Sequence, residues 1–372
     1  MIEQLFFELI RVAIGTQKCL SHTPADAQWQ ELYALAKKQS LVGVCFAGVQ
    51  KVLSNSPLKG EDPSVIGLPE LQYLRWMGMA AKIQQRNETV DSQCVTLGKE
   101  LQKAGLDYVV MKGQEVGRYY HELSALRQSG DIDVWITNKG RKEVVAYAES
   151  AGCCGEATHQ HVHFHPFVDT EVELHYIPAE LHCPWYDRSL MRFFRSQTKG
   201  FAMCEEGYRV PTVEFDLLHQ LAHSFRHLFG DGIGMRQVMD FYFTLQEALR
   251  RDNVDWQAVR QAIRSTGMKR FAEAMLWIMQ EVFGMSGSNI STLSCKIGIE
   301  PQERLGRFLL NEVMLAGNFG HTDERINRGA HESAWHRFWR VNKQNVKLMR
   351  FSVWEVLCTP PWRIINYLCF RV

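Results

Sequence analysis

Three short stretches in the middle of the chain have the alternating pattern of β-strands, whereas the long segments on either side have the pattern of helices. The stretches are Asp107–Met111 (DYVVM), Asp131–Ile136 (DIDVWI) and Val168–Tyr176 (VDTEVELHY). Alternation of apolar and polar residues places one set of side chains on each face of a strand. Residues 115–123 and 140–150 between them have helix-forming composition, so this region predicts a compact mixed α/β unit.

The flanking segments carry apolar residues at helical spacing, which predicts amphipathic helices. This spacing holds over residues 1–53 and again over residues 70–104, and the Pro- and Gly-containing stretch over residues 54–69 predicts a loop between them. Four further helical patterns follow residue 212, and residues 317–329 predict a late glycine-containing loop.

We therefore predict an α+β fold, in which a small mixed sheet with its helices is flanked by helical segments at both ends. A chain of 372 residues is too long for one ordinary hydrophobic core. The predicted division is an N-terminal helical segment over residues 1–104, the α/β core over residues 105–210 and a C-terminal helical domain over residues 211–372.

The charge balance argues against a strong attraction of the whole chain to nucleic acid or to an anionic membrane. The chain has 42 Lys and Arg against 41 Asp and Glu, a formal charge of +1, so an anionic ligand needs a local site. Its 10 cysteines form no C-x-x-C pair and indicate reduced thiols. No apolar run is long enough to span a bilayer, and Glu3 and Glu8 are unlike the start of a signal peptide. We expect a cytoplasmic protein.

The D-x-D motif at the start of the second strand is the first candidate for chemistry. Residues two apart on a strand share a face, so Asp131 and Asp133 should project together while Ile132 and Val134 turn into the core. Two adjacent carboxylates repel each other and raise one pKa unless a cation lies between them. A hard divalent ion with oxygen ligands, above all Mg²⁺, is therefore expected here.

A third acid is expected from the last strand. Glu173 lies between two apolar residues, and alternation places it on the same side as Glu171 and His175. If this strand pairs beside the D-x-D strand, Glu173 can complete a two-metal site for an in-line displacement.

The order of these motifs resembles the polymerase-beta-like nucleotidyltransferase superfamily. Within it, K-G at Lys112–Gly113, then G-D-I-D-V-W-I, V-E-L-H-Y, H-x-x-x-H on a helix and G-M-R-Q-V-M-D-F closely resemble a bacterial group of uncharacterised nucleotidyltransferases. The resemblance covers roughly Tyr108–Tyr242 with motifs and implies a nucleotidyltransferase-like α/β core.

This resemblance implies a reaction and a metal. The enzyme would transfer a nucleoside monophosphate from an NTP to an acceptor hydroxyl on a small molecule, a sugar or a protein, with release of pyrophosphate and no nucleic-acid partner. Asp131, Asp133 and Glu173 match the catalytic, metal-binding acids, with two Mg²⁺ ions when the NTP is bound and Mn²⁺ as an alternative.

The resemblance also implies a nucleotide-binding set. The glycine turn of the superfamily is Gly-Ser and holds the triphosphate, whereas here Gly113 follows Lys112 and precedes Gln114. Lys112 would supply charge, Gln114 a hydrogen bond, and Arg127 a guanidinium at the rim of the site.

Two other functions remain open from the sequence. The first is a non-catalytic nucleotide-binding or regulatory module on the same fold. The second is a metal-dependent hydrolase centred on the run HQHVHFH, whose four histidines at positions 159, 161, 163 and 165 would share one strand face. Same-face residues lie about 6–7 Å apart, so one ion could hold only a pair. We therefore favour a polar strand face, with His161, His163 and His175 as candidate contacts of the cleft.

The later helices carry weaker signals. His219, His223 and His227 at four-residue intervals favour helix packing behind the α/β unit over metal binding. Arg236 and Asp240 fit either an internal ion pair or a contact to the nucleotide. In the C-terminal segment, which favours packing over a membrane-surface role, Pro360–Pro361 predicts the end of a helix.

Overall fold

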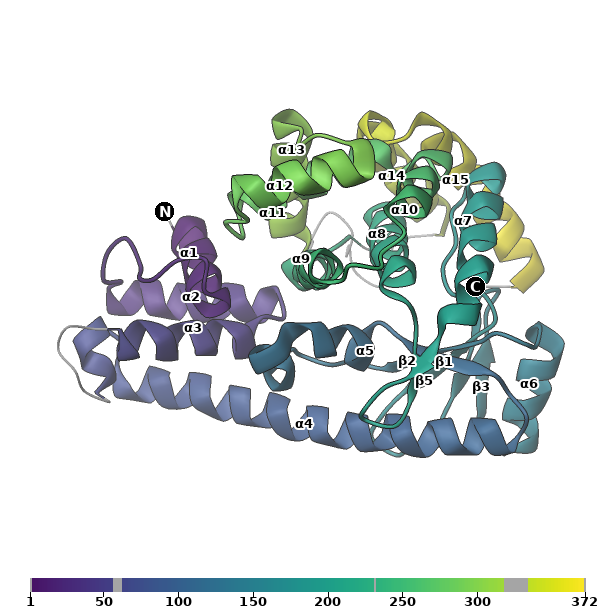
Figure 1. The fold of residues 1–372 in the computed structure, drawn as a ribbon, viewed down its shortest axis with the longest axis horizontal. Helices are drawn as coiled ribbons and strands as arrows, with labels where there is room; N and C mark the ends of the chain where they lie inside the picture. The colour runs from purple at the N-terminus through teal and green to yellow at the C-terminus, as the bar shows by residue number, and fades with distance from the viewer. Residues whose placement is uncertain (1, 56–61, 231, 318–333, 371–372) are drawn as a thin grey trace.

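The computed structural model describes residues 2–55, 62–230, 232–317 and 334–370 (Figure 1). The described chain is 67% helical and contains a small mixed sheet with flanking helices, which confirms the predicted α+β class. Residues 56–61 of the first predicted loop and residues 318–329 of the second lie outside the described residues.

The N-terminal segment is helical, as predicted. Helix α1 packs closely on α3, and the long helix α4 begins after Pro69 and ends where Gly105 adopts a φ of 71°. A positive φ directly after a helix is the usual glycine-dependent end of such an element. The elements here are α1 (Ile2–Ile14), α2 (Asp26–Lys38), α3 (Val42–Ser54), η1 (Pro63–Ile66) and α4 (Glu70–Lys103).

Five short strands form the main sheet in the order β1-β2-β5-β4-β3. Strands β2 and β5 are parallel, and the other neighbouring pairs are antiparallel. The strands are β1 (Tyr108–Met111), β2 (Ile132–Ile136), β3 (Cys154–Ala157), β4 (His161–Phe164) and β5 (Val172–His175). They are connected in part by α5 (Gly113–Gly117), η2 (Arg118–Leu126) and α6 (Arg141–Ser150).

From Pro184 onward the described residues are helical apart from a small hairpin of two-residue strands, which the sequence did not predict. Thr212 begins helix α8 by accepting a hydrogen bond from the backbone of Phe215. The elements are α7 (Pro184–Gln197), η3 (Thr198–Gly200), β6 (Ala202–Met203), β7 (Arg209–Val210), α8 (Val213–Leu228), α9 (Met235–Arg250), α10 (Trp256–Ser265), α11 (Lys269–Glu281), α12 (Gly287–Leu293), η4 (Ser294–Gly298), α13 (Glu303–Ala316), α14 (Ala334–Asn345), η6 (Val346–Arg350) and α15 (Val353–Phe370).

Two buried clusters lie on the two faces of the sheet. The larger one joins the N-terminal helices, one sheet face and the C-terminal helices, and Trp135 of β2 stacks on Phe215 of α8 within it. The smaller cluster covers the opposite face, where Val110 and Val134 meet residues of α4 and α6. Polar side chains on the face of Trp135 therefore lie beneath the C-terminal helices.

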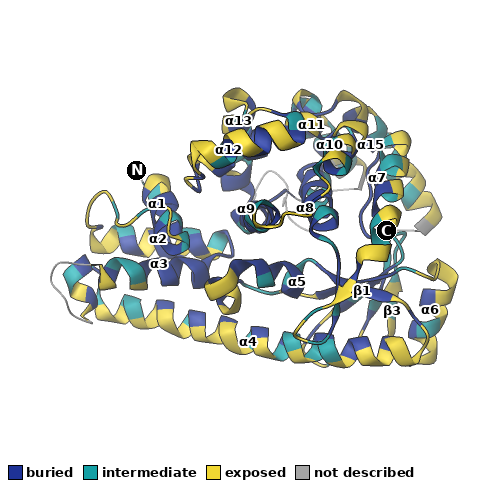
Figure 2. Ribbon diagram, in the orientation of Figure 1, coloured by how far each residue is buried: buried dark blue, intermediate teal, exposed yellow. Residues whose placement is uncertain are grey.

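Helix α4 contributes to both clusters. Trp76 and Ile83 in its first half belong to the larger cluster, whereas Val90 and Leu97 in its second half belong to the smaller one. Figure 1 shows α4 running from the N-terminal helices to the sheet, and Figure 2 shows its outer side exposed. The three predicted segments are thus in contact, and their exact boundaries stay a prediction.

The predicted helix end at Pro360–Pro361 is wrong, because α15 continues to Phe370. Proline removes one helical hydrogen bond, and tertiary contacts on both sides offset this loss. Before the prolines, the buried Glu355 side chain accepts hydrogen bonds from the backbone of His182 and Cys183. After them, Arg363 donates to the carbonyl of Phe229. Among the described residues, no helix combines the length and the apolar character that crossing a membrane requires.

Two carboxyl groups are buried together between α5 and α8. Glu115 and Asp216 are 0% and 1% exposed, and the hydroxyl of Tyr119 donates to Oδ2 of Asp216 at 2.7 Å. Burial raises the pKa of Asp216 to about 7, and burial together with Asp216 raises the pKa of Glu115. The folded protein therefore favours the protonated carboxyls.

The buried pair of Glu115 and Asp216 predicts that the free energy of unfolding decreases as pH rises. Between about pH 4 and 7, Asp216 is protonated in the folded chain and deprotonated in the unfolded chain. The contribution of Asp216 to the free energy of unfolding therefore decreases as pH rises through this range. We expect the free energy of unfolding of wild type, relative to Asp216→Asn, to be larger at pH 5 than at pH 8 by on the order of 2 kcal/mol. Urea unfolding at both pH values measures this difference. The same substitution at the exposed Asp252 should show no comparable change.

Candidate functional site

Three acids lie together in one cavity of about 530 Å³. The parallel register of β2 and β5 pairs Asp133 directly with Glu173, and Asp131 precedes β2 by one residue. Ile132 and Val134 point into the smaller core cluster, as the alternation predicted. The structure therefore brings Asp131, Asp133 and Glu173 to one edge of the cavity, and their catalytic role stays a prediction.

Lys112 reaches these acids through an unusual backbone conformation. It follows β1 directly, and its φ of 54° is rare for a residue with a side chain. Its Nζ lies 2.7 Å from Oδ1 of Asp133, and only 16% of the side chain is exposed. Burial favours the neutral amine, but the carboxylates of Asp133 and Glu173 outweigh it and raise the pKa of Lys112.

The buried side chain of His175 contacts two of the acids. Its Nε2 lies 2.9 Å from Oδ1 of Asp133 and 3.0 Å from Oε2 of Glu173, and its Nδ1 faces the carbonyl of Ile177 at 3.3 Å. Burial opposes the imidazolium, yet the hydrogen bonds to both acids raise the pKa of His175. This environment favours the imidazolium form, and the ring contacts both carboxylates at the wall of the cavity.

The acids respond differently to this environment. Despite burial, the charges of Lys112 and His175 hold the pKa of Asp133 well below its usual range, and His175 lowers the pKa of Glu173. The negative charge of Asp133 raises the pKa of Asp131 to about 6. Asp131 is thus the acid that an added cation would stabilise most.

Arg127 lies in the cavity lining and forms a buried ion pair. Its Nε and Nη2 each lie 2.8 Å from an oxygen of Asp240 on α9, and the two side chains are 6% and 5% exposed. The hydroxyl of Tyr120 also donates to Asp240 at 2.7 Å. This pair joins the loop before β2 to α9, so Arg127 holds structure here and its predicted phosphate contact stays a prediction.

The other two nucleotide-binding candidates lie in different places. Gly113 lines the cavity of the acids. Gln114 points to a second cavity of about 190 Å³, where its Nε2 donates to Oδ1 of Asp91 at 2.6 Å. The structure therefore does not bring Gln114 to the acids.

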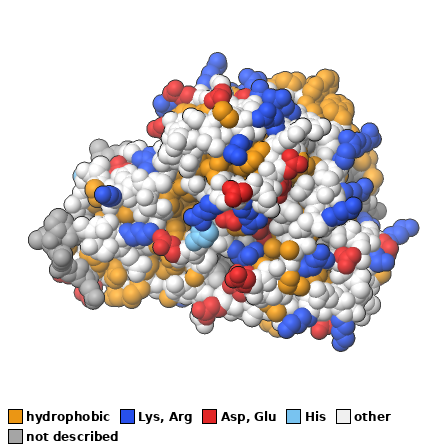
Figure 3. Space-filling model, viewed as in Figure 1, with side chains coloured by type: hydrophobic (Ala, Val, Ile, Leu, Met, Phe, Trp, Pro, Cys, Tyr) orange, Lys and Arg blue, Asp and Glu red, His pale blue; other side chains and the backbone are white. Residues whose placement is uncertain are grey.

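Helices α8 and α9 add two arginines to this cavity: Arg236, which the sequence left open between an ion pair and a nucleotide contact, and Arg226, which it did not single out. Arg226 lies 3.5 Å from Oε1 of Glu180, and Nη1 of Arg236 donates to the carbonyl of Gln128 at 3.0 Å. The spacing of Arg226 from His223, three residues along one helix face, was the signal that could have identified it. Figure 3 shows acidic and basic side chains with a histidine gathered near the centre of the visible face.

The histidines of α8 divide between packing and the cavity. His219 is fully buried, and its Nε2 bonds to the carbonyl of Pro178 at 3.0 Å, which confirms the packing expected for this residue. His223 and His227 line the cavity instead, so the packing prediction is wrong for them. Asp240, left open in the sequence, lies in the ion pair with Arg127.

The four histidines of HQHVHFH do not share a strand face. Strand β4 covers only His161–Phe164, because the backbone turns before it and after it. His159 precedes the strand and bonds to Glu180 at 2.6 Å, whereas His165 follows it and is exposed. His161 lies opposite His175 and His163 opposite Glu173, so both lie beside the acids. Burial, with His175 second, lowers the pKa of His161 to about 4.

The structure is an α+β protein in which three acids of the mixed sheet lie in one cavity with lysine and arginine side chains. Residues 25–284 match the family model described as uncharacterised nucleotidyltransferase. The match covers most of the chain and the whole site, so the chain belongs to this family and the predicted family is confirmed. Comparisons with curated proteins and with solved structures found no match.

Proposed function

We propose that this protein is a magnesium-dependent nucleotidyltransferase that moves a nucleoside monophosphate from an NTP to an acceptor hydroxyl and releases pyrophosphate. The observation that carries the proposal is the pairing of Asp133 with Glu173 on adjacent parallel strands, beside Asp131, in a cavity also lined by Lys112 and several arginines. Carboxylates for a divalent ion and cations for phosphates are the two requirements of this chemistry.

The donor set fits magnesium. Asp131, Asp133 and Glu173 offer only carboxylate oxygens, which Mg²⁺ prefers, and the raised pKa of Asp131 reflects repulsion that a cation would relieve. When bound, magnesium neutralises charge on the phosphates and favours deprotonation of the acceptor hydroxyl. Mn²⁺, with similar ligand preferences, is the proposed alternative ion.

The chain's own residues would position the nucleotide. Lys112 lies close enough to the acids to contact phosphate oxygens beside them, and Arg226 and Arg236 line the same cavity. Guanidinium and ammonium groups at these places would neutralise the triphosphate and hold it in line with the acceptor. His175 would keep Asp133 and Glu173 oriented, because its Nε2 contacts both. The proposed acceptor is a hydroxyl on a small molecule, a sugar or a protein.

Turnover with a panel of nucleotides tests this function. We expect Mg²⁺-dependent release of pyrophosphate with at least one of the four NTPs when extracts fractionated into small molecules, glycans and proteins supply the acceptor. Pyrophosphate release is measured by a coupled phosphate assay, and transfer is followed with an NTP labelled at the α-phosphate. Tight NTP binding without label transfer to any fraction would contradict the proposal and support a non-catalytic nucleotide-binding module.

A further inference from the structure

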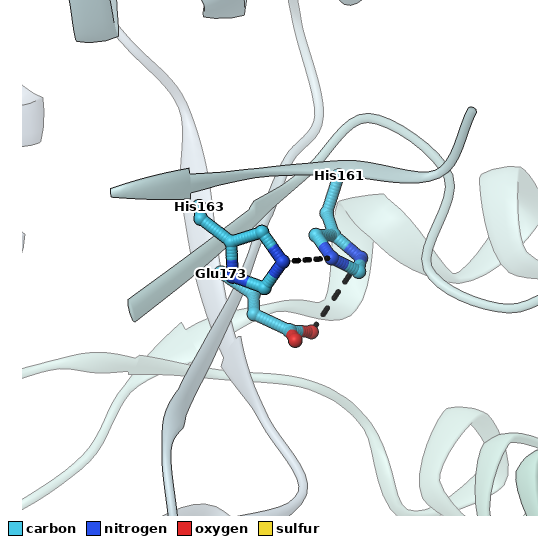
Figure 4. A group of neighbouring side chains, drawn as sticks. All are labelled: His161, His163 and Glu173. Carbon is cyan, nitrogen blue, oxygen red and sulfur yellow. Dashed lines mark hydrogen bonds and ion pairs between the residues drawn. The ribbon is translucent and has the colours of Figure 1, made fainter. Parts of the chain in front are cut away.

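His161 and His163 face each other on the cavity side of β4. Their Nε2 atoms lie 3.4 Å apart, and the two rings are nearly perpendicular, with an interplanar angle of 88°. Figure 4 shows both rings projecting from one strand toward Glu173 of the neighbouring strand. Two ligands bound to one tetrahedral ion at about 2.0–2.1 Å are themselves roughly 3.4 Å apart, so this spacing equals that of two imidazoles on a single metal.

Glu173 supplies a third ligand atom. One atom each from His161, His163 and Glu173 can be chosen so that all lie within 4.8 Å of one another. Strand β5 places Glu173 directly opposite His163, and its Oε2 lies 3.5 Å from the His161 ring, a distance measured to Nδ1 rather than to the Nε2 that faces His163. Two imidazoles and one carboxylate form a three-ligand set that leaves a fourth position for water or a substrate oxygen.

A neighbouring carboxylate orients one of the rings. Oε1 of Glu171 lies 2.9 Å from Nδ1 of His163, on the side of the ring away from Nε2. This contact is an ion-pair distance without the alignment of a hydrogen bond, and a carboxylate on this side of the ring leaves Nε2 as the atom facing the ion. Glu171 directly precedes β5, the strand that carries Glu173, so the third ligand and the acid beside His163 come from one short segment.

We propose that His161, His163 and Glu173 bind one transition-metal dication of the Zn²⁺ or Co²⁺ type, next to the magnesium position at Asp131 and Asp133 and sharing Glu173 with it. Imidazole nitrogens suit these ions and suit Mg²⁺ poorly, so the two positions differ in the metal they accept. This second position does not depend on the proposed transfer reaction.

Cobalt binding to the full-length protein tests the proposal. We expect one Co²⁺ per chain, detected by the visible absorption of a low-coordinate Co²⁺ site and displaced by Zn²⁺ but not by millimolar Mg²⁺. His161→Ala and His163→Ala should each weaken Co²⁺ binding by more than about 100-fold, beyond the roughly 10–100-fold expected for Glu171→Gln as an outer-partner change. His165→Ala is the matched control, because this exposed histidine lies outside the cluster.

Two results would overturn the inference. The first is a wild-type protein that binds no Co²⁺ in the absorption titration, and the second is equal affinity in wild type and in a folded His163→Ala variant, with folding checked by circular dichroism. Asp131→Asn separates this proposal from the proposed function, since it should abolish transfer and retain Co²⁺ binding. Loss of transfer therefore leaves the cobalt result to decide the metal site independently.

Discussion

Replacing Asp131 with asparagine is expected to lower the rate of nucleotidyl transfer by roughly 10²–10³-fold, the scale seen when one preorganised electrostatic group is removed from an active site. The substitution keeps the size of the side chain and removes one negative charge from the edge of the cavity where Asp133 and Glu173 converge. Asp131 is exposed and precedes β2, so the variant should fold normally. Steady-state release of pyrophosphate measures the effect.

Asp133→Asn is expected to lower the rate of transfer to the same degree and also to lower stability. Asp133 is 4% exposed and contacts both Lys112 and His175, so the amide would remove the negative charge that these two side chains share. Thermal unfolding of both variants separates these effects. Glu149→Gln, at an exposed position on α6, serves as the control for loss of an acid. Full activity in both aspartate variants would rule out the proposed site.

Arg127→Ala is expected to lower the free energy of unfolding by about 3–5 kcal/mol, because it leaves the buried carboxylate of Asp240 without its bidentate partner. Asp240 would keep the hydrogen bond from Tyr120 and the nearby charge of Arg236. Chemical denaturation monitored by tryptophan fluorescence measures the change. Replacing both partners, as Arg127→Met with Asp240→Leu, should recover part of the loss because no unpaired charge remains.

Arg127→Lys tests separately whether Arg127 stabilises the fold and whether it contributes to nucleotide binding. Arg127→Lys keeps the charge and loses the two parallel hydrogen bonds, so we expect intermediate stability. If Arg127 also contacts phosphate, as the family resemblance implies, the folded lysine variant should show weaker NTP binding. A loss below 1 kcal/mol in Arg127→Ala would contradict the structural role of the ion pair.

The sequence was sufficient for features that depend on local pattern. Alternation in D-I-D-V-W-I correctly predicted that Ile132 and Val134 enter the core while Asp133 faces away from it. Helical spacing predicted α4 to within a residue at its C-terminal end, where Gly105 follows. These successes have a common cause, because neighbours along the chain determine both periodicity and helix ends.

Features that depend on distant contacts were not predictable in this way. The partner of Arg127 is 113 positions away in the sequence, and no local pattern relates the two residues. Gln114 turns away from the acids because the positive φ of Lys112 redirects the chain after β1. The continuation of α15 past its prolines depends on contacts with residues 182, 183 and 229. In each case the local sequence is compatible with more than one conformation, and tertiary contacts stabilise the one that is observed.

Helix α4 has a consequence for how the protein unfolds. Because one uninterrupted helix supplies Trp76 and Ile83 to one hydrophobic cluster and Val90 and Leu97 to the other, neither cluster can lose its packing without exposing part of the same helix. Helices propagate cooperatively, so a break in the middle of α4 would cost hydrogen bonds on both sides of it. The two hydrophobic clusters therefore belong to one cooperative unit. The positions of Asp131, Asp133 and Glu173 on the sheet depend on the stability of this whole unit rather than on that of one cluster.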